Sequence, residues 1–236
     1  MKMEFPHVAS IRDFYAFEEH VKTCRKHRGL EMASQWYQAP VFYFSNPVCV
    51  IGHDAAVKAP HGSSALDYEL EIACIIGESA RDLPADDSAM DVVAGFTIMN
   101  DWSARDIQRI EMAVGLGPSK SKDFATSLGP VVVSFDKLRD HYRDGRLHLE
   151  MTARVNGKEY SRGNSGSMYW SWPQLLAHAS RDTMLRPGDV LGSGTVGTGC
   201  ILELTPEAVG GWLQPGDIVE LSVEHIGALR NSVVAN

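Results

Sequence analysis

The stretch LDYELEIACIIG, residues 66 to 77, combines two strand patterns in one segment. In its first half, apolar residues alternate with Asp67, Glu69 and Glu71, which is the period-two pattern of a β-strand. From Ile72 onward both faces are apolar, which is typical of a strand buried on both sides. The fold must therefore supply groups that neutralise carboxylates on one side of a buried element.

The composition predicts a globular protein of one large domain or two small ones. The 236 residues are 44% hydrophobic and 22% charged, and a chain of this length can bury a substantial core. The net charge of −8 argues against nucleic acid as the main partner. No apolar run approaches the roughly 20 residues of a membrane span, and the start MKMEFPHV has no signal-peptide core. These features predict a cytoplasmic protein that binds neither nucleic acid nor membranes.

The four cysteines argue against a disulfide framework. Cys24, Cys49, Cys74 and Cys200 form no C-x-x-C pair and lie in apolar or mixed surroundings. Reduced and mostly buried thiols in a cytoplasmic protein are the expected state.

Strand patterns outnumber helical ones along the chain. Strands are expected within residues 39–52, 66–77, 91–101, 129–135, 147–160, 189–194, 200–204 and 217–227, with Asn156-Gly157 as a hairpin turn. Helices are expected at residues 10–29, 103–113 and 170–182. Because strands and helices do not alternate regularly, a doubly wound fold is disfavoured. We expect one α+β, strand-dominated domain over residues 1–236.

The first expected helix would place Asp13 and His20 on one face. Ser10 and Asp13 have the spacing of a capping box, and Gly29 can end the helix. Asp13 and His20 are seven residues apart, which is two helical turns or about 10 Å along the axis. From the pattern alone, a capping aspartate and a surface histidine are the favoured interpretation.

Glu69 and Glu71 are candidate ligands for a cation. A solvated strand face is the simpler interpretation, but the same face continues into apolar residues. Two carboxylates two positions apart raise each other's pKa unless a cation offsets their charge. Asp101, which ends an apolar strand pattern, is the third candidate, although a turn or capping role is an even alternative. Ser103 is expected to cap the next helix, leaving Asp101 free. Oxygen ligands without nearby Cys or His favour Mg²⁺, Mn²⁺ or Ca²⁺ over zinc.

The glycine-rich segment GSGTVG, residues 192–197, formally matches the dinucleotide-binding pattern G-x-G-x-x-G. The following CILEL is expected to be a strand, where that fingerprint requires a helix, so a Rossmann turn is rejected. The glycines are expected to let backbone N–H groups approach an anionic substrate. A plain glycine-rich turn is the alternative.

Six motifs occur in the order found in the fumarylacetoacetate hydrolase family. They are DFYAFEEH, LDYELEIA, NDWSARDIQ, KSKDFATSLGP, GSGTVG and CILEL. The sequence resembles this family from about residue 10 to 230. The resemblance implies a mixed β-roll or β-sandwich with a few peripheral helices, built around a buried divalent metal, and a homodimer. Larger members carry an N-terminal β domain for which this sequence shows no counterpart.

The resemblance also assigns roles to individual residues. The implied ligands of the metal, Mg²⁺ in the first place, are Glu69, Glu71, Asp101 and Asp13. The implied catalytic residues are the histidine His20, the acid Glu203 that orients it, and Lys122, which stabilises the developing carbanion. The implied substrate contacts are Gln108, Thr195 and Arg105. These assignments replace the capping interpretation of Asp13 and the surface interpretation of His20.

Three departures from fumarylacetoacetase concern the substrate. Met112 stands where that enzyme has a tyrosine, one extra residue precedes Lys122, and FYFSNP differs from its substrate loop. The implied activity is metal-dependent hydrolysis of a C–C bond in a β-diketone or acylpyruvate, in catabolism of aromatic or related compounds. The alternatives are a 2-oxoacid decarboxylase, an enol isomerase or hydratase, and a metal-stabilised binding protein without turnover. The presence of both His20 and Glu203 favours hydrolysis, since a lyase has less need of a water-activating base.

Overall fold

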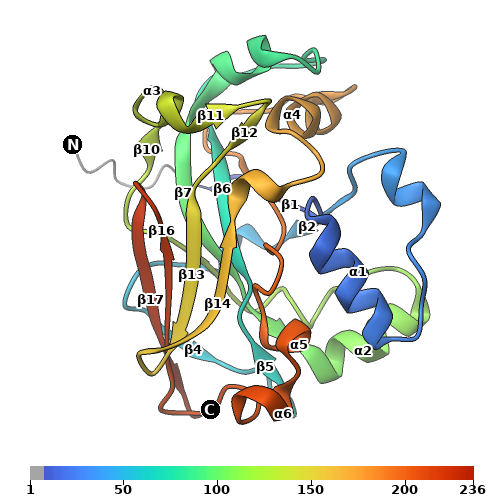
Figure 1. Cartoon of the computed structure of the whole chain (residues 1–236), viewed down its shortest axis with the longest axis vertical. Helices are drawn as coiled ribbons and strands as arrows, with labels where there is room; N and C mark the ends of the chain where they lie inside the picture. Colours follow the sequence, from blue (N-terminus) through green and yellow to red (C-terminus); the bar gives the residue numbers. More distant parts are fainter. Residues whose placement is uncertain (1–7) are drawn as a thin grey trace.

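The computed structural model describes residues 8–236 and consists of two packed β-sheets with helices around their edges (Figure 1). Residues 1–7, on which the expectation about a signal peptide partly depends, lie outside the described residues. Between Val8 and Asn236, no helix is long and apolar enough to cross a membrane. The expected strand-dominated α+β class is confirmed.

The larger sheet has eight strands and carries most of the candidate site. Its order is β2 (Phe42–Ser45), β1 (Ile11–Phe14), β15 (Val190–Gly192), β6 (Leu70–Ile76), β7 (Val93–Asp101), β9 (Thr126–Leu128) and β3 (Val50–Ile51), with β10 (Val133–Ser134) also paired to β7. β1 runs parallel to β15, which runs antiparallel to β6. In this pairing β15 alone separates β1 from β6, which carries part of the acidic stretch.

The second sheet has five strands and packs its apolar side chains into the main core. Its order is β14 (Lys158–Asn164), β13 (Glu150–Val155), β16 (Ile218–Val223), β17 (Gly227–Val234) and β4 (Ala56–Lys58). The hairpin expected at Asn156-Gly157 is confirmed, with φ of 52° and 80° at its two residues. Met151, Ala153 and Val155 point into the core, as the period-two pattern requires. Two short ladders, β5 (Leu66–Asp67) with β8 (Ser103–Ala104) and β11 (Tyr142–Arg143) with β12 (Arg146–Leu147), complete the strands.

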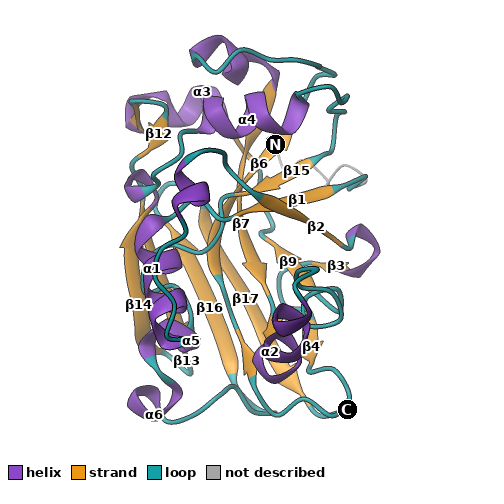
Figure 2. Ribbon diagram, turned by 90° about the vertical axis from the view of Figure 1, so that its right-hand side faces the viewer, coloured by secondary structure: helices purple, strands orange, loops and turns teal. Residues whose placement is uncertain are grey.

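The helices lie around the sheets. They are α1 (Glu18–His27), α2 (Arg105–Val114), α3 (Phe135–Leu138), α4 (Trp172–Ser180), α5 (Ile201–Leu204) and α6 (Pro206–Val209). α3 and α4 lie at one end of the molecule and α6 at the other (Figure 1). α1 and α5 lie side by side (Figures 1 and 2). The 3₁₀ turns are Ser34–Tyr37, Pro47–Cys49, Asp87–Val92, Arg139–His141 and Ser165–Ser167.

The helix expected over residues 10–29 is wrong in its first half. Ile11–Phe14 form β1, and α1 begins only at Glu18. β1 lies between β2 and β15 with all four residues buried, so pairing within the sheet outweighs the local capping pattern. Asp13 and His20 therefore lie on different elements and share no helical face.

The strand expected for CILEL is also wrong, because these residues form the single turn α5. The Asp67 carboxylate accepts hydrogen bonds from the amides of Ile201 (2.8 Å) and Leu202 (3.0 Å). An acid at this position stabilises the start of a helical turn. The dinucleotide fingerprint stays excluded, since four residues make too short a helix and the segment's Gly194 amide donates to Glu71.

Two smaller predictions also fail. Ser103 does not cap α2; it lies in β8, and its hydroxyl donates to the Asp101 carbonyl at 3.0 Å. The helix expected at 170–182 forms as α4. It is the only helix expected in the late part of the chain, where the structure also has the short helices α5 and α6. The cysteine prediction is confirmed for burial: Cys24, Cys74 and Cys200 are buried, and all four thiols are free.

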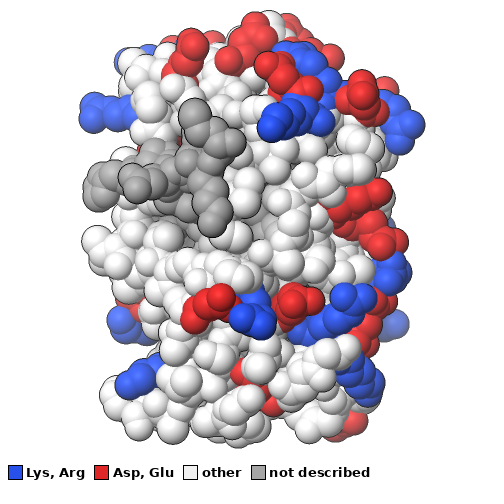
Figure 3. Space-filling view, turned by 90° about the vertical axis from the view of Figure 1, so that its left-hand side faces the viewer, with Lys and Arg blue, Asp and Glu red and all other residues white. Residues whose placement is uncertain are grey.

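Charged side chains of both signs are interspersed on the face drawn in Figure 3. A mixed surface of this kind keeps like charges apart. Charged groups are also buried together inside the fold.

Candidate metal centre and active site

Four buried carboxylates form a cluster, here called the carboxylate cluster. Its members are Asp13, Glu69, Glu71 and Asp101, and an oxygen from each lies within 4.8 Å of the others. Each residue is at most 5% exposed. They come from β1, the residue before β6, β6 itself and the end of β7. The structure thus brings together the four acids that the resemblance assigns to the metal.

The register of the larger sheet explains why Asp13 and Glu71 meet. Asp13 pairs with Gly192 in β15, and Gly192 pairs with Ala73 in β6. A Cβ atom at position 192 would lie 2.4 Å from Asp13 Oδ1 and 3.1 Å from Glu71 Oε2. Only glycine leaves room for the two carboxylates to approach each other across β15.

Lys122 supplies positive charge directly to the carboxylate cluster. Its Nζ donates to Glu69 Oε2 at 2.6 Å and to Asp101 Oδ2 at 2.5 Å. Burial opposes its charge, but these two carboxylates raise the pKa of Lys122 above its ordinary value. Lys120, by contrast, has a side chain that is 74% exposed and pairs with Asp123 at 2.8 Å. The structure therefore places Lys122, and not Lys120, at the cluster.

Arg105 joins three of the polar groups around the cluster. Its guanidinium donates to Asp67 Oδ2 and to Glu69 Oε1, both at 2.8 Å. It also donates to Gln108 Oε1 at 2.9 Å. The carboxylates at the start of the acidic stretch are thus neutralised by Arg105 and Lys122.

The remaining carboxylates have too few positive partners. Burial and neighbouring carboxylates raise the pKa values of Asp13 and Glu71. Burial raises the pKa of Asp101 as well, although Lys122 opposes the shift. Asp13 Oδ1 and Asp101 Oδ1 are buried without a hydrogen-bond partner. Excess negative charge and unpartnered carboxylate oxygens fit a hard divalent cation, which takes oxygen ligands.

The sequence interpretation missed Tyr43. Its hydroxyl donates to Asp101 Oδ2. β2 pairs antiparallel with β1 in a register that sets Tyr43 opposite Asp13. Burial, followed by the charges of Asp101 and Asp13, raises the pKa of Tyr43 and keeps its phenol protonated as a donor. The period-two pattern of FYFS was the available signal, but its pairing with β1 was hidden because residues 10–29 read as a helix.

His20 and Glu203 form a buried pair beside the carboxylate cluster. His20 Nδ1 and Glu203 Oε1 are 2.5 Å apart, and both side chains are at most 4% exposed. Burial opposes protonation of His20, but hydrogen bonds with Cys200 and Glu203 raise the pKa of His20 to about 10. The positive charge of His20 also lowers the pKa of Glu69, so the pair and the cluster interact electrostatically.

The glycine-rich segment and the residue after it connect the two groups. The Gly194 amide and the Thr195 hydroxyl donate to Glu71 at 3.1 and 3.3 Å. The Thr198 amide donates to Glu203 Oε2 at 3.0 Å. Gly194 has φ of +79°, and a Cβ there would lie 2.4 Å from a backbone oxygen of β1, so only glycine fits. One short segment therefore positions an acid from each group.

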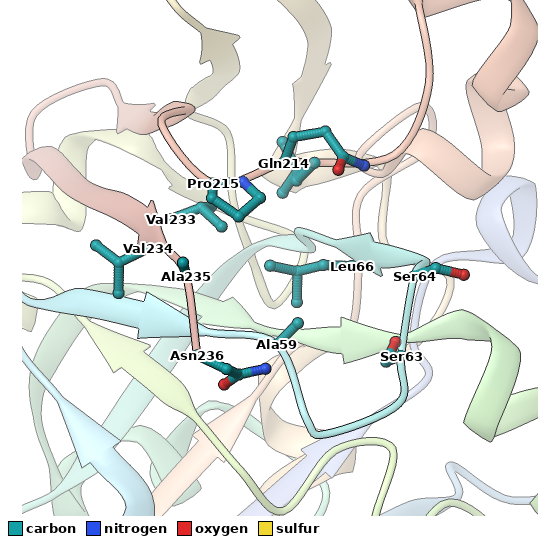
Figure 4. Close-up of a pocket in the computed structure, with 11 residues that line it drawn as sticks. Ala59, Ser63, Ser64, Leu66, Gln214, Pro215, Val233, Val234, Ala235 and Asn236 are labelled. Carbon is teal, nitrogen blue, oxygen red and sulfur yellow. The ribbon is translucent and has the colours of Figure 1, made fainter.

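Two other features of the molecule contribute no ionisable side chain. Met112 is on α2 and is 38% exposed. A small pocket near the C-terminal strand is lined by Ala59, Ser63, Ser64, Leu66, Leu213, Gln214, Pro215 and residues 233–236 (Figure 4). None of the side chains that line this pocket is ionisable.

Comparisons with known proteins show the family of this sequence. Residues 9–234 match the family model described as Fumarylacetoacetate (FAA) hydrolase C-terminal. Oxaloacetate tautomerase YisK of Bacillus subtilis is 34% identical over 218 residues, which cover 90% of this chain and 67% of that protein. Fumarylacetoacetase of Arabidopsis thaliana is 31% identical over 273 aligned residues, which cover 91% of this chain and 65% of that enzyme.

A solved structure confirms the fold. The crystal structure of fumarylpyruvate hydrolase from Pseudomonas aeruginosa, in complex with Mn²⁺ and pyruvate, matches with a TM-score of 0.79. The match covers 100% of this chain and 93% of that chain at 22% identity. The strand-rich arrangement of mixed sheets with few helices is thus the one implied by the six sequence motifs.

Proposed function

Because the chain belongs to the fumarylacetoacetate hydrolase family, we propose that it is a metal-dependent enzyme that hydrolyses a C–C bond in a β-diketone or acylpyruvate. The observation that carries the proposal is the buried His20–Glu203 pair, which the glycine-rich segment and Thr198 connect to the carboxylate cluster. A base and a cation site held by one segment suit attack of water on a substrate held nearby. Catabolism of aromatic or related compounds is the setting that such substrates suggest.

The carboxylate cluster would hold the cation. Asp13, Glu69, Glu71 and Asp101 offer oxygen ligands only, which favours Mg²⁺, with Mn²⁺ or Ca²⁺ as alternatives. The Mn²⁺ and pyruvate bound by the fumarylpyruvate hydrolase support this assignment. When bound, the cation would act as a Lewis acid towards the dicarbonyl oxygens.

His20 would act as the general base. Glu203 engages Nδ1, which orients the imidazole. A cation bound at the neighbouring carboxylate cluster would lower the raised pKa of His20, so that the neutral imidazole could take a proton from water at Nε2. Attack of this water on the distal carbonyl and cleavage of the adjacent C–C bond would yield a carboxylic acid and a pyruvate-like or acetoacetate-like fragment. The proton on His20 would then return to the carbanion carbon, which balances the reaction as addition of one water.

Four polar residues would position the substrate and stabilise charge. Lys122 lies where negative charge would develop and could offset it. Gln108 and Thr195 would contact the substrate. Arg105 would act through Gln108, whose side-chain oxygen it already holds.

A second candidate reaction is keto–enol tautomerisation of a 2-oxoacid such as oxaloacetate. The observation in its favour is the pKa of His20, which is raised to about 10 by Cys200 and Glu203 against the effect of burial. A protonated imidazole is an acid that could deliver a proton to an enolate without activating water. The similarity to an oxaloacetate tautomerase supports the same candidate.

A substrate screen tests both candidates. Purified protein loaded with Mg²⁺ or Mn²⁺ is assayed on acylpyruvates, fumarylacetoacetate-like diketones and oxaloacetate, with products identified by mass spectrometry. Hydrolysis predicts an acid and an oxoacid fragment from at least one acylpyruvate or diketone. Enol–keto conversion of oxaloacetate without cleavage of any diketone would replace the main proposal with the second. Absence of turnover on all three classes would favour a binding protein.

We also propose that the chain forms a homodimer with one catalytic domain per subunit. The apolar side chains of Ile110, Val114 and Leu116 are between 70% and 93% exposed on and just after α2. Exposed apolar groups gathered in this way are typical of interaction surfaces. Light scattering measures the mass directly, and a monomer at micromolar concentration would contradict the proposal.

A further inference from the structure

A second group of side chains that could bind a metal ion contains His20 itself and two cysteines. His20, Cys24 and Cys200 each offer a ligand atom within 4.8 Å of the others, and all three are buried. Cys24 follows His20 by four residues in α1, so both side chains occupy the same helix face. Cys200 immediately precedes α5, which lies beside α1. These three residues are called the thiol–imidazole cluster.

We propose that the thiol–imidazole cluster binds Zn²⁺ or another thiophilic divalent cation, at a site separate from the carboxylate cluster. Two cysteines and one histidine are the protein ligands of zinc sites that keep a fourth position open. Thiolate and imidazole ligands prefer zinc, whereas carboxylate oxygens prefer magnesium or manganese. The chain would therefore contain two cation sites with opposite preferences.

The distances suit tetrahedral coordination. Zinc–sulfur bonds of about 2.3 Å and zinc–nitrogen bonds of about 2.0–2.1 Å separate neighbouring ligands by roughly 3.5–3.8 Å. Cys24 Sγ lies 3.7 Å from His20 Nε2. Cys24 Sγ also lies 3.8 Å from His20 Nδ1. Since one ring nitrogen of His20 and both sulfur atoms lie within 4.8 Å of one another, the cluster would need to contract by little more than about 1 Å to reach these separations.

Glu203 provides the supporting contact that zinc-bound histidines have. A histidine that ligates zinc through one ring nitrogen usually donates its other N–H to a carboxylate, which fixes the tautomer. His20 Nδ1 lies 2.5 Å from Glu203 Oε1, so a cation bound through Nε2 would have this supporting contact. Both cysteines would bind as thiolates and release their protons, so affinity should increase with pH.

A cation in this site would inhibit the enzyme. It would occupy His20 Nε2, the atom that takes the proton from water in the proposed mechanism. This consequence rests on the proposed function, but binding of the cation does not.

Cobalt spectroscopy tests the binding site without any substrate. Co²⁺ is added to protein already saturated with Mg²⁺, and the absorption spectrum is recorded. One equivalent should give an intense thiolate-to-cobalt charge-transfer band together with the visible bands of tetrahedral Co²⁺. The band should be lost in both Cys24→Ser and Cys200→Ser and kept in the control Cys49→Ser, whose thiol lies outside the cluster. Binding of Co²⁺ to wild-type protein without a thiolate band would overturn the proposal, whether or not the variants fold.

Zinc titration tests the consequence. Each protein, with Mg²⁺ held constant, is compared with its own rate before Zn²⁺ is added. Zn²⁺ should inhibit wild type and Cys49→Ser at about one equivalent, and Cys24→Ser should need at least ten times more. Equal inhibition of Cys24→Ser would place the inhibitory ion at the carboxylates and overturn the proposal. A thiolate band in the cobalt spectrum without inhibition by Zn²⁺ would instead contradict the role of His20 as base.

Discussion

The carboxylate cluster and the thiol–imidazole cluster are neighbours built in different ways. The first is assembled from strands far apart in sequence, whose register and a glycine in β15 bring the acids together. In the second, His20 and Cys24 lie one helical turn apart in α1, and Cys200 comes from the residue before the neighbouring helix α5. The acids have an excess of negative charge, whereas His20 already has Glu203 as a partner. The first region is therefore expected to depend on a cation for both stability and activity, and the second is not.

Removing the cation should have the largest effect. Exhaustive dialysis against EDTA should lower turnover by about 10³-fold or more, since a Lewis acid contributes several kcal/mol. The melting temperature should also fall, because buried like charges lose their counter-ion. Mg²⁺ should restore both, and full activity after dialysis would contradict the dependence on a cation.

Replacing Lys122 should have the next largest effect. Lys122→Met keeps most of the stem but removes the charge that contacts Glu69 and Asp101. The expected loss is about 3 kcal/mol or more, mainly in kcat rather than KM, because the charge acts on the transition state. Lys120→Met, at an exposed position in the same loop, is the matched control and should change almost nothing. Equal effects of the two changes would show that Lys122 has no special role.

Replacing His20 tests the proton-transfer role that both proposed reactions give to this residue. His20→Ala should lower hydrolysis of a diketone by at least about 10²-fold, the contribution of a general base. Metal affinity should stay nearly unchanged, because His20 is not among the carboxylate ligands. His27→Ala, at the exposed end of α1, is the control. An unchanged rate for His20→Ala on every hydrolysable substrate would remove this residue from the mechanism.

Removing the hydroxyl of Tyr43 should have a smaller effect. Tyr43→Phe removes one hydrogen bond to Asp101 and leaves the carboxylates in place. Loss of a hydrogen bond that orients a metal-binding side chain lowers metal affinity, so the affinity should fall by roughly tenfold. Tyr37→Phe, which removes a hydroxyl paired with Glu18 away from the cluster, is the control. A loss as large as that of a cluster carboxylate would mean that Tyr43 is itself a ligand.

The pH dependence of stability is a separate readout, because it concerns the melting temperature rather than turnover or metal affinity. The pKa of His20 is raised to about 10 in the folded protein, compared with about 6.5 in an unfolded chain. Its contribution to stability is therefore complete below about pH 6.5 and lost as pH rises through about 10. In EDTA-treated protein, the melting temperature of wild type should exceed that of Glu203→Gln at pH 6.5, and the difference should shrink towards pH 10. A constant difference across this range would show that His20 is neutral throughout.

Local patterns predicted the parts of the site that lie within one element. The period-two pattern around Glu69 and Glu71 and the end of an apolar strand at Asp101 were readable because adjacent strands carry them. A polar start followed by a helical pattern predicts a helix at Asp13 and hides a strand whose partners are distant in sequence. The contact of Tyr43 is hidden for the same reason. Sheet pairing between remote segments is a tertiary property, which local propensity does not contain.

Binding of Mn²⁺ to protein freed of metal tests the central claim most directly. Electron paramagnetic resonance of free Mn²⁺ during titration gives both stoichiometry and affinity. Wild type and His20→Gln should each bind one Mn²⁺ per chain with similar affinity, whereas Glu71→Gln should bind at least about 10²-fold more weakly. Equal binding by wild type and Glu71→Gln, or no binding by wild type, would contradict the assignment of the carboxylate cluster as the metal centre.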